Sequence, residues 1–322
     1  MFRPGRLILL AGLAVAAAVG LVLALWYGPG PSATPVRVAI TQGETLSAAA
    51  RTIGAAGALR APRLFRRMAR VLGSDRPIQA GEYEIPARAS PAVILGLLQD
   101  GRVIQHMITV PEGMASILVY EKLRAEPLLT GTTAVPAEGS ALPDSYSFER
   151  GETRAAVLAR MQTAMTETLD AAWKARKPTS VVKNKREALI LSSIVEKETA
   201  IPSERRIVAA VYSNRIRQGM RLQADPTTIY PITKGKPLGR RIRRSELDAV
   251  NGYNTYAMAG LPTGPIANPG RDSIVAVLDP APSDALFFVA DGKGGHAFAR
   301  TLAEHEANRQ RYYAIRRSRG EM

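Results

Sequence analysis

The sequence predicts an α+β protein in three parts: an apolar N-terminal helix, a small module of two strands and two helices, and a larger mixed α/β domain. Residues 7–27 contain no charged side chain. Strand-like and helix-like patterns follow one another over residues 36–85, and longer helices, short strands and turn-rich segments fill the remainder. We expect a cytoplasmic tip with a transmembrane anchor at 1–28, a linker at 29–35, the module at 36–108 and the large domain at 109–322.

Composition supports a folded, basic protein. Of the 322 residues 46% are hydrophobic, which provides material for a core and argues against disorder. The chain has no cysteine, so disulfides, thiolate metal sites and cysteine nucleophiles are excluded. Lysine and arginine outnumber aspartate and glutamate by 43 to 28, a formal charge of +15. This excess suits a polyanionic partner such as nucleic acid, anionic lipid or an acidic wall polymer.

The apolar segment at residues 7–27 is long enough to cross a membrane, because roughly 20 helical residues at about 1.5 Å each span the hydrocarbon core. Arg3 and Arg6 precede this segment, and Trp26 with Tyr27 stands where an interfacial aromatic pair belongs. Positive residues stay inside the cell. We therefore expect a single-pass anchor in the cell (inner) membrane, with the rest of the chain on the extracytoplasmic side.

A cleaved signal peptide is the alternative, with a small-residue cleavage site near residues 32–33. Signal peptides usually have a shorter apolar region, which favours the anchor. Both interpretations export the body of the protein, so nucleic acid is not expected as a partner.

The module begins with a strand at residues 36–40, followed by helical spacing over Glu44–Ile53. Pro62 opens a second helix, and residues 79–85 are typical of a strand. This order resembles the LysM-like subdomain that binds glycan in many wall enzymes, and a generic α+β cap is the alternative. After it the pattern predicts a helix capped by Ser90 and ended by Gly101, a strand at 105–110, a helix at 116–124, loops over 127–148 and a long helix from about Gly151.

The helix predicted over Lys185–Thr199 carries the most informative residue. Glu198 follows Ile194 by four positions and Leu191 by seven, which places it on the apolar face. Glu196 is expected on a more polar side with Ser192 and Ser193. Burial among aliphatic groups raises the pKa of a carboxyl, as a general acid near neutral pH requires. Glu198 is therefore the candidate catalytic residue, and an ion pair with Arg205 or Arg206 is the structural alternative.

The segments after Glu198 are rich in amides, hydroxyls and aromatic rings, the groups that bind sugars. Prolines and glycines among them stiffen loops into a cleft wall. The candidate substrate-binding residues are Asn214, Arg215, Gln223, Asp225, Thr227, Tyr253, Asn254, Thr255, Tyr256 and His296. For His296 a structural role is an equal alternative.

Several other kinds of site are not expected. Residues 292–295 lack the spacing of a phosphate loop and are typical of a hairpin turn. The histidines, His106, His296 and His305, are scattered and no HExxH motif is present, so neither a metal nor a cofactor is expected. The chain has no GxSxG motif for a serine hydrolase. Residues 240–244 form a basic patch typical of a solvated loop that faces wall polymer or lipid.

Several long motifs resemble those of the endolytic murein transglycosylase family, the YceG-like proteins. They are EGSALPDSYSF from Glu138, VEKETA, SER, YSNRI, GMRLQADPTTIY, YNTYAMAGLPTGPIANPG and FFVADGKGGHAF. The resemblance runs in order from about Val110 to Tyr312, and the preceding module and single anchor also fit.

The resemblance implies that Glu198 is the catalytic glutamate, the second of the EKET motif. It implies cleavage of the bond between N-acetylmuramic acid and N-acetylglucosamine within nascent peptidoglycan strands. The muramic acid 6-hydroxyl attacks in place of water and leaves a 1,6-anhydro end, so one glutamate serves first as acid and then as base. Asp225 is the best candidate for a second carboxylate, but we expect it to position substrate or fix a loop.

Peptidoglycan glycan strands are the expected partner, and the family suggests peptidoglycan synthases as protein partners. The alternatives are a non-catalytic glycan-binding scaffold and a hydrolytic muramidase that uses Glu198 with water. Two segments depart from the family. Residues 140–142 are smaller than in many relatives, and residues 231–244 are short and basic. We expect these departures to affect which glycans or stem peptides are accepted, and not the reaction class.

Overall fold

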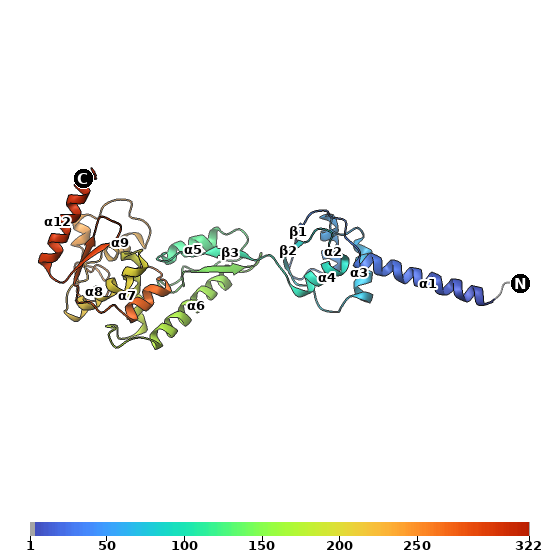
Figure 1. The fold of residues 1–322 in the computed structure, drawn as a ribbon, viewed down its shortest axis with the longest axis horizontal. Helices are drawn as coiled ribbons and strands as arrows, with labels where there is room; N and C mark the ends of the chain where they lie inside the picture. The colour runs from blue at the N-terminus through green and yellow to red at the C-terminus, as the bar shows by residue number, and fades with distance from the viewer. Residues whose placement is uncertain (1–3, 322) are drawn as a thin grey trace. The chain divides into compact units, whose positions relative to one another are not determined.

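The computed structural model describes residues 4–321 as a mixed α/β protein that divides into two compact units. Unit 1 holds the described residues up to His106 together with Ser147–Gly151. Unit 2 holds Met107–Tyr146 and the described residues from Glu152 onward. Figure 1 shows the elements of each unit in chain order. Arg3 and the side chain of Arg6, which entered the expected membrane orientation, lie outside the described part of the chain.

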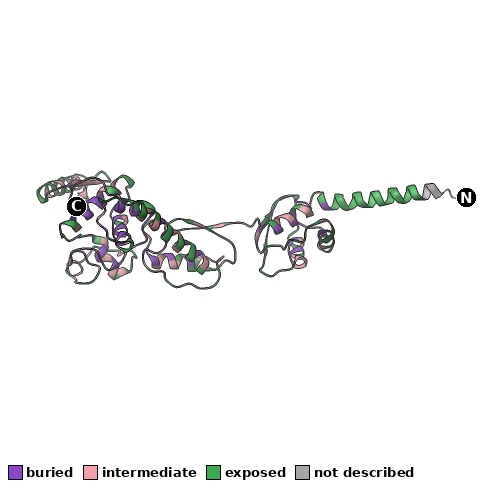
Figure 2. Ribbon diagram, turned by 90° about the horizontal axis from the view of Figure 1, so that it is seen from below, coloured by how far each residue is buried: buried purple, intermediate pink, exposed green. Residues whose placement is uncertain are grey.

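The predicted N-terminal apolar helix is confirmed. α1 runs from Pro4 to Tyr27, and Ile8–Tyr27 is the one stretch of residues 4–321 that is long and apolar enough to cross a membrane. Its mean hydropathy is 2.8, and α1 is exposed over nearly all of its described length (Figure 2). The expected interfacial aromatic pair needs a correction. Tyr27 is exposed, but Trp26 is only 2% exposed because it packs into the core of unit 1.

Unit 1 has the predicted order of strand, two helices and strand. β1 (Val36–Ile40) pairs antiparallel with β2 (Gly81–Ile85), with Val36 opposite Ile85. Alternate strand residues enter a core with α2 (Leu46–Ala55), α3 (Pro62–Leu72) and α4 (Pro91–Asp100). The Ser90 hydroxyl accepts from Val93 N at 3.3 Å, and Gly101 ends α4 with a φ of 65°. Both predicted ends of α4 are confirmed.

A second two-stranded sheet joins β3 (His106–Thr109) and β4 (Ser145–Phe148). The boundary between the units passes through both strands. β4 corrects the sequence interpretation, which assigned residues 127–148 to loops. Four residues give too short an alternation to separate a strand from a polar loop.

Helices dominate unit 2. α6 (Arg154–Lys174), α7 (Lys185–Glu198), α8 (Arg205–Arg217) and α11 (Arg271–Leu278) share one core, in which α7 packs against the other three. The 3-10 turn η1 (Pro202–Glu204) leads directly into α8. The other elements are α5 (Ser116–Ala125), α9 (Asp225–Thr233), α10 (Arg244–Leu247), β5 (Phe287–Ala290), β6 (His296–Ala299) and α12 (Leu302–Ser318).

The segment after α8 differs from the loop that the sequence suggested, because α9 begins at Asp225. Proline in the first turn and an acidic N-terminal residue favour a helix start as much as a turn. The predicted hairpin at 292–295 is confirmed. β5 and β6 are antiparallel, and the Asp291 carboxylate accepts from Lys293 N at 2.6 Å and Gly295 N at 3.0 Å.

Candidate active site

Glu198 is the last residue of α7, with Thr199 as the C-cap. Asn184 caps the start of the helix, and its side chain accepts from Glu187 N at 2.9 Å. Leu191, Ile194 and Val195 on its apolar face are fully buried. The helix dipole also disfavours a negative charge at this end. Packing and helix position therefore both favour the neutral form of the Glu198 carboxyl.

The pKa of Glu198 is raised from 4.5 to about 7, mainly because burial removes water from the charged form. A hydrogen bond from the Tyr212 hydroxyl and the charges of His296 and Arg215 oppose this rise, whereas the charge of Asp225 adds to it. One carboxyl oxygen, Oε1, is buried without a hydrogen-bond partner among residues 4–321. The predicted environment of Glu198 is confirmed, and its carboxyl can hold or release a proton near neutral pH.

Tyr212 is the neighbour that sequence reasoning missed. It lies on α8, is 1% exposed, and its ring stands edge-on to Phe288 of β5 at 5.9 Å. Burial, together with the nearby carboxyl, raises the pKa of Tyr212 well above its usual value, so its hydroxyl remains a donor. It lies three residues before Arg215 in the YSNRI motif, and this helical spacing to a candidate residue was the available signal.

Asp225 and Tyr256 form a second pair beside Glu198. The Tyr256 hydroxyl donates to Asp225 Oδ1 at 2.6 Å, and burial with this hydrogen bond raises the pKa of Tyr256. The charge of Glu198 also acts on Tyr256. Gln223, two residues before Asp225, is exposed and has a left-handed φ of 53°. Such strain in a residue other than glycine is held by its surroundings and is frequent at functional sites.

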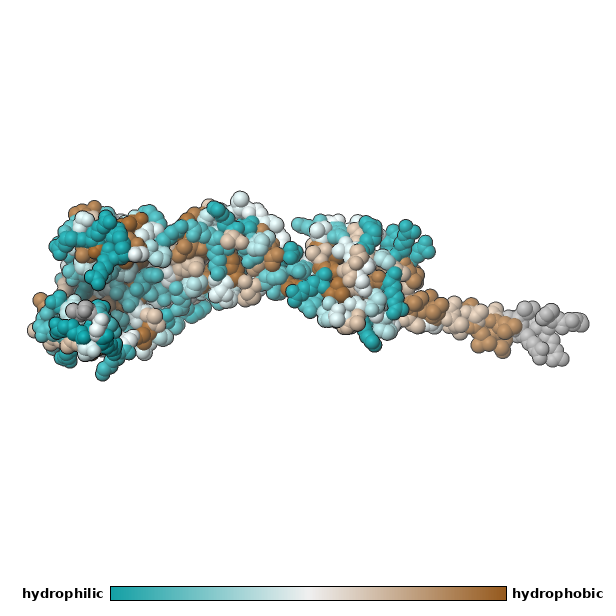
Figure 3. All heavy atoms as spheres, turned by 90° about the horizontal axis from the view of Figure 1, so that it is seen from above, coloured by the Kyte–Doolittle hydropathy of each residue, from teal (hydrophilic) through white to brown (hydrophobic). Residues whose placement is uncertain are grey.

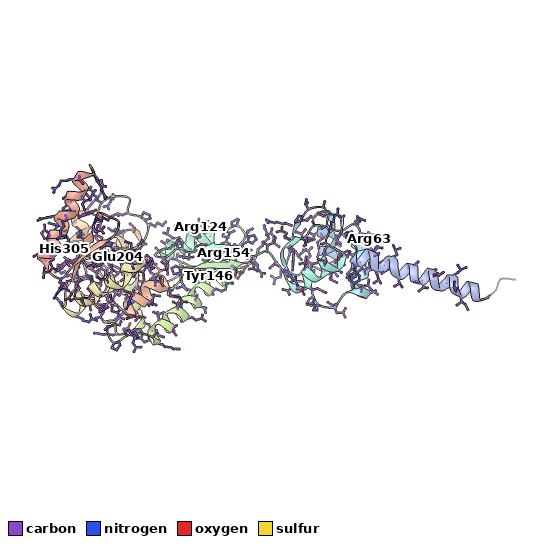
Figure 4. The ribbon with its side chains drawn as sticks, viewed as in Figure 1. Arg63, Arg124, Tyr146, Arg154, Glu204 and His305 are labelled. Carbon is purple, nitrogen blue, oxygen red and sulfur yellow. The ribbon has the colours of Figure 1, made fainter. Side chains whose placement is uncertain are left out.

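His296 reaches the site from β6. Its Nδ1 lies 2.7 Å from Glu204 Oε2, and its backbone N donates to Glu204 Oε1 at 2.8 Å. Glu204, labelled in Figure 4, also accepts from the Thr199 hydroxyl at 3.0 Å. The bond to Glu204 fixes the imidazole and keeps Nδ1 as a donor. The structure thus brings five side chains together around the Glu198 carboxyl: Tyr212, Arg215, Asp225, Tyr256 and His296.

Five of the candidate substrate-binding residues, Arg215 among them, use polar groups for hydrogen bonds inside unit 2. Thr227 and Thr255 are fully buried and join their hydroxyls at 2.8 Å. Asn254 is fully buried and donates to three backbone carbonyls, including Ala249 O at 2.7 Å. Asn214 donates to Ser283 O and Ala285 O, and the buried Arg215 donates to Leu222 O and Leu286 O. These five side chains fasten loops and have little capacity left for a ligand.

Tyr253 remains partly exposed, with its ring 4.9 Å from that of Tyr230. Tyr230 lines a cavity of about 460 Å³ between the end of α7 and α9, together with Lys197 and Pro226. The last two are the sequence neighbours of Glu198 and Asp225. The part of the Tyr253 ring that stays exposed offers a surface on which a sugar can stack.

The ion pair proposed as the alternative for Glu198 is not present. Arg205 lies 3.5 Å from Glu196 Oε1 and also pairs with Glu112 and Asp272. Glu196 further accepts from Gly270 N at 2.9 Å, and its side chain is only 5% exposed. The prediction that Glu196 lies on a polar side of α7 is therefore wrong, because this side of the helix is packed against other residues.

Two motifs upstream and downstream of α7 hold the loops around it. Glu138 accepts from Ser116 N at 2.8 Å and from the Tyr230 hydroxyl at 3.1 Å, and burial raises its pKa. Asn268 is fully buried and joins Ala141 N to Met114 O. Within residues 4–321 no group of three or more histidine, aspartate or glutamate residues is arranged to hold a metal ion.

Comparisons with known proteins agree with the motifs. An endolytic murein transglycosylase of Bacillus subtilis is 27% identical over 316 residues, covering 87% of this chain and 86% of the relative. An enzyme of the same name from Streptococcus pneumoniae is 32% identical over 177 residues, covering 53% of this chain and 31% of that longer protein. The crystal structure of a YceG-like protein from Listeria monocytogenes aligns with a TM-score of 0.54 at 24% identity, over 85% of this chain and 98% of that one.

The family match covers most of the chain. The YceG-like family matches residues 38–311, a range that includes Glu198, Asp225 and His296. The resemblance that the motifs suggested is thereby confirmed, and the crystal structure supports the same fold. The chain belongs to the YceG-like family.

Proposed function

We propose that this protein is a membrane-anchored lytic transglycosylase that cleaves peptidoglycan within its glycan strands, with Glu198 as the catalytic residue. The observation that carries the proposal is the Glu198 carboxyl itself. Its pKa is about 7, and its Oε1 is buried without a hydrogen-bond partner within residues 4–321. The relatives named endolytic murein transglycosylase support the reaction class. The enzyme is thus a carbon–oxygen lyase that acts on a polysaccharide.

The first half of the reaction needs an acid. Protonated Glu198 gives its proton to the oxygen that links N-acetylmuramic acid to N-acetylglucosamine, and the bond from that oxygen to C1 breaks. With a pKa of about 7, both the protonated and the charged form of Glu198 are populated near neutral pH.

The second half of the reaction needs a base, and Glu198 can now act as one because it has become a negatively charged carboxylate. The Glu198 carboxylate takes the proton of the muramic acid 6-hydroxyl while O6 bonds to C1, which closes a 1,6-anhydro ring. No water enters and the carboxyl ends as it began, so one titratable residue is sufficient. Tyr212 holds the carboxyl in position through its hydrogen bond.

Asp225 tunes the site in this proposal and does not act as a second catalytic carboxylate. Its charge raises the pKa of Glu198 and it holds the Tyr256 hydroxyl at 2.6 Å. Gln223, Tyr253 and the cavity beside Lys197 are the best placed of the remaining groups to contact glycan, because they retain exposure or free surface.

The anchor and the small module complete the proposed arrangement. α1 spans the cell membrane once and places the body of the chain on the extracytoplasmic side, near nascent glycan. The module at residues 36–108 is a LysM-like glycan-binding subdomain, which the order of β1, α2, α3 and β2 supports. Peptidoglycan synthases are the protein partners that this location suggests, and no cofactor takes part.

The decisive experiment is Glu198→Gln in the full-length protein, with Glu167→Gln on the exposed face of α6 as the matched control. Purified glycan strands are digested and the products are identified by mass spectrometry. We expect the Glu198 variant to lose at least about 1,000-fold in rate while it still binds glycan, and the control to retain full rate.

The products separate the alternatives. Anhydro-muramic ends support the transglycosylase, whereas reducing muramic ends would mean a hydrolytic muramidase that uses water. A wild-type protein that binds strands without cutting them in a membrane would be a scaffold. Unchanged cleavage by the Glu198→Gln protein would remove the catalytic assignment.

A further inference from the structure

The helix α3 of unit 1 carries a dense set of exposed arginines and no acid. No aspartate or glutamate occurs between Thr45 and Ser74. Four arginines in and just before α3 are exposed, and among residues 4–321 none of them lies at ion-pair distance from a carboxylate. This α3 arginine surface consists of Arg60, Arg63, Arg67 and Arg70. The fields of these unpaired cations reinforce one another.

Apolar side chains stand exposed beside the arginines. Leu64 is 41% exposed and Val71 is 82% exposed. They lie about two helical turns apart on the same side of α3. Phe65 and Met68, on the adjoining face of α3, are buried and fix the helix to the module. A basic stripe next to an apolar stripe is the pattern of a helix that lies in a membrane interface.

The structure holds this helix beside the end of the membrane span. Trp26 at the end of α1 stacks on Phe65 of α3 with ring centroids 6.0 Å apart. A cavity of about 260 Å³ is lined by Leu25 from the span and by Arg60 and Leu64 from the α3 region. Figure 4 shows the labelled Arg63 at the end of the module that α1 joins, and Figure 3 shows hydrophilic side chains around that end.

The segment between α1 and the module is not free to swing. Gly30 N donates to Arg88 O at 3.0 Å, and Arg88 N donates to Ser32 O at 2.7 Å. Arg88 has a left-handed φ of 55°, which only such fixed surroundings maintain. A side chain on Gly30 would stand 2.3 Å from Ala89 O. The module therefore keeps α3 at the level where the apolar span ends, the level of lipid headgroups.

We propose that α3 is a second membrane contact of this protein, at which the α3 arginine surface binds the phosphates of anionic phospholipids. Guanidinium groups pair well with phosphate. The exposed Leu64 and Val71, and the cavity shared with the membrane span, match the glycerol and upper acyl region of a bilayer. They have no counterpart on an acidic wall polymer, which makes lipid the better occupant.

The absence of cysteine allows a direct test in the full-length protein, because any introduced cysteine is the only labelling site. Val71→Cys carries an environment-sensitive fluorophore on α3, and Val250→Cys, 88% exposed in unit 2, is the matched control. The proteins are placed in nanodiscs of phosphatidylcholine or of an equimolar mixture with phosphatidylglycerol, each with a headgroup-labelled quenching lipid. We expect quenching at position 71, and not at 250, in the anionic mixture, and we expect salt to weaken it.

A pair of charge variants assigns the effect to the arginines. Arg63→Gln with Arg67→Gln should lower the ratio of bound to free α3 roughly 30-fold, since each basic side chain contributes about fivefold at an anionic surface. Arg124→Gln with Arg317→Gln, two exposed arginines of unit 2, should leave it unchanged. Thermal unfolding of each variant checks that the module remains folded.

Three results would overturn the proposal. Equal quenching in phosphatidylcholine alone would mean that apolar insertion suffices. Absence of quenching in the anionic mixture would mean that α3 faces water. Protection of the label by added anionic wall polymer, without quenching by lipid, would assign the arginines to that polymer.

Discussion

Two glutamates near the C-terminal end of α7 lie on opposite sides of the helix and differ in how their charges are compensated. Glu196 faces a region in which Arg205 and the backbone N–H of Gly270 compensate its charge. Glu198 faces a region in which Oε1 has no partner within residues 4–321. The nearby cations, Arg215 and His296, are each bonded to other groups. The Glu196 side chain is only 5% exposed and Oε1 of Glu198 is buried, so the difference between the two carboxyls lies in how their charge is compensated.

This comparison separates structural from functional charge. A buried carboxylate that is paired and hydrogen-bonded maintains the fold, and removal of its partner leaves an isolated charge. A buried carboxyl without such partners keeps its proton to a higher pH, which is a cost to stability and an advantage for acid catalysis. The variants below test each side of α7 in turn.

The largest effect on stability is expected for Arg205→Ala. Arg205 is 8% exposed and pairs with Glu196, Glu112 and Asp272, so its loss isolates a buried charge. We expect a decrease in the free energy of unfolding of about 3–5 kcal/mol, measured by urea denaturation. Arg206→Ala is the matched control, because Arg206 is half exposed and its pair with Asp279 contributes at most about 1 kcal/mol. Equal losses in the two variants would contradict the structural role of Arg205.

Glu198→Gln should stabilise the protein, and only at higher pH. The pKa of Glu198 is about 7 in the folded chain against 4.5 for the free side chain, so folding favours the protonated form. The penalty is absent below about pH 4, grows between the two pKa values and is complete above the folded pKa. A difference of about 2.5 units corresponds to about 3 kcal/mol as an upper limit.

The measurement is the Tm of wild type and variant at pH 5 and pH 8. The Tm gain of the Gln variant should be larger at pH 8. Glu196→Gln, two residues away on the compensated side, should lower Tm at pH 8, because it weakens the bonds to Arg205 and Gly270. The same sign of effect for both variants would remove the distinction between the two sides of α7.

Local periodicity explains what the sequence could predict of this site. The spacing of Leu191, Ile194 and Glu198 is contained in a single helix, and it was sufficient to identify the buried carboxyl. The other side of α7 was assigned wrongly, because serines suggested a polar face. Ser192 and Ser193 are fully buried and donate to Ala188 O and Ile190 O, both at 2.7 Å. A hydroxyl that bonds its own helix allows packing on every side.

Long-range partners were beyond the reach of local patterns. Arg205 and Glu112 are 93 residues apart, and Glu204 meets His296 across 92 residues. The groups that bind sugars are also those that fasten loops, so composition alone could not separate exposed Gln223 from buried Asn254. The order of elements in unit 1 was predictable because short segments with clear capping residues form it, whereas β4 and α9 depend on tertiary contacts.

Glu204→Gln tests whether Glu204 influences Glu198 through its contact with His296. Glu204 bonds both the ring and the backbone of His296, and the positive charge of His296 lowers the pKa of Glu198. The variant weakens the hold on the ring, and we expect a loss of roughly 10–100-fold in kcat.

The pH profile distinguishes this positioning role from a structural one. The variant holds the charge of the His296 ring less firmly beside Glu198, so the pKa of Glu198 should rise and the alkaline limb of kcat/KM should move to higher pH. Glu167→Gln on the exposed face of α6 is again the control and should leave both quantities unchanged. A drop in rate with an unmoved limb would assign Glu204 to the fold alone.

The smallest effect is expected for Asp225→Asn, and it decides between one catalytic carboxylate and two. Its charge raises the pKa of Glu198, so the neutral amide should move the alkaline limb of kcat/KM to lower pH, by less than about one unit. Asparagine can still accept from Tyr256 through its Oδ1, so the loop should hold. Tyr256→Phe removes that hydrogen bond and keeps the charge, and it should leave the limb near its original place. If Asp225→Asn instead abolished turnover as completely as Glu198→Gln, the reaction would need a second carboxylate. Glu198, on the side of α7 where charge is not compensated, would then be only one of two catalytic residues.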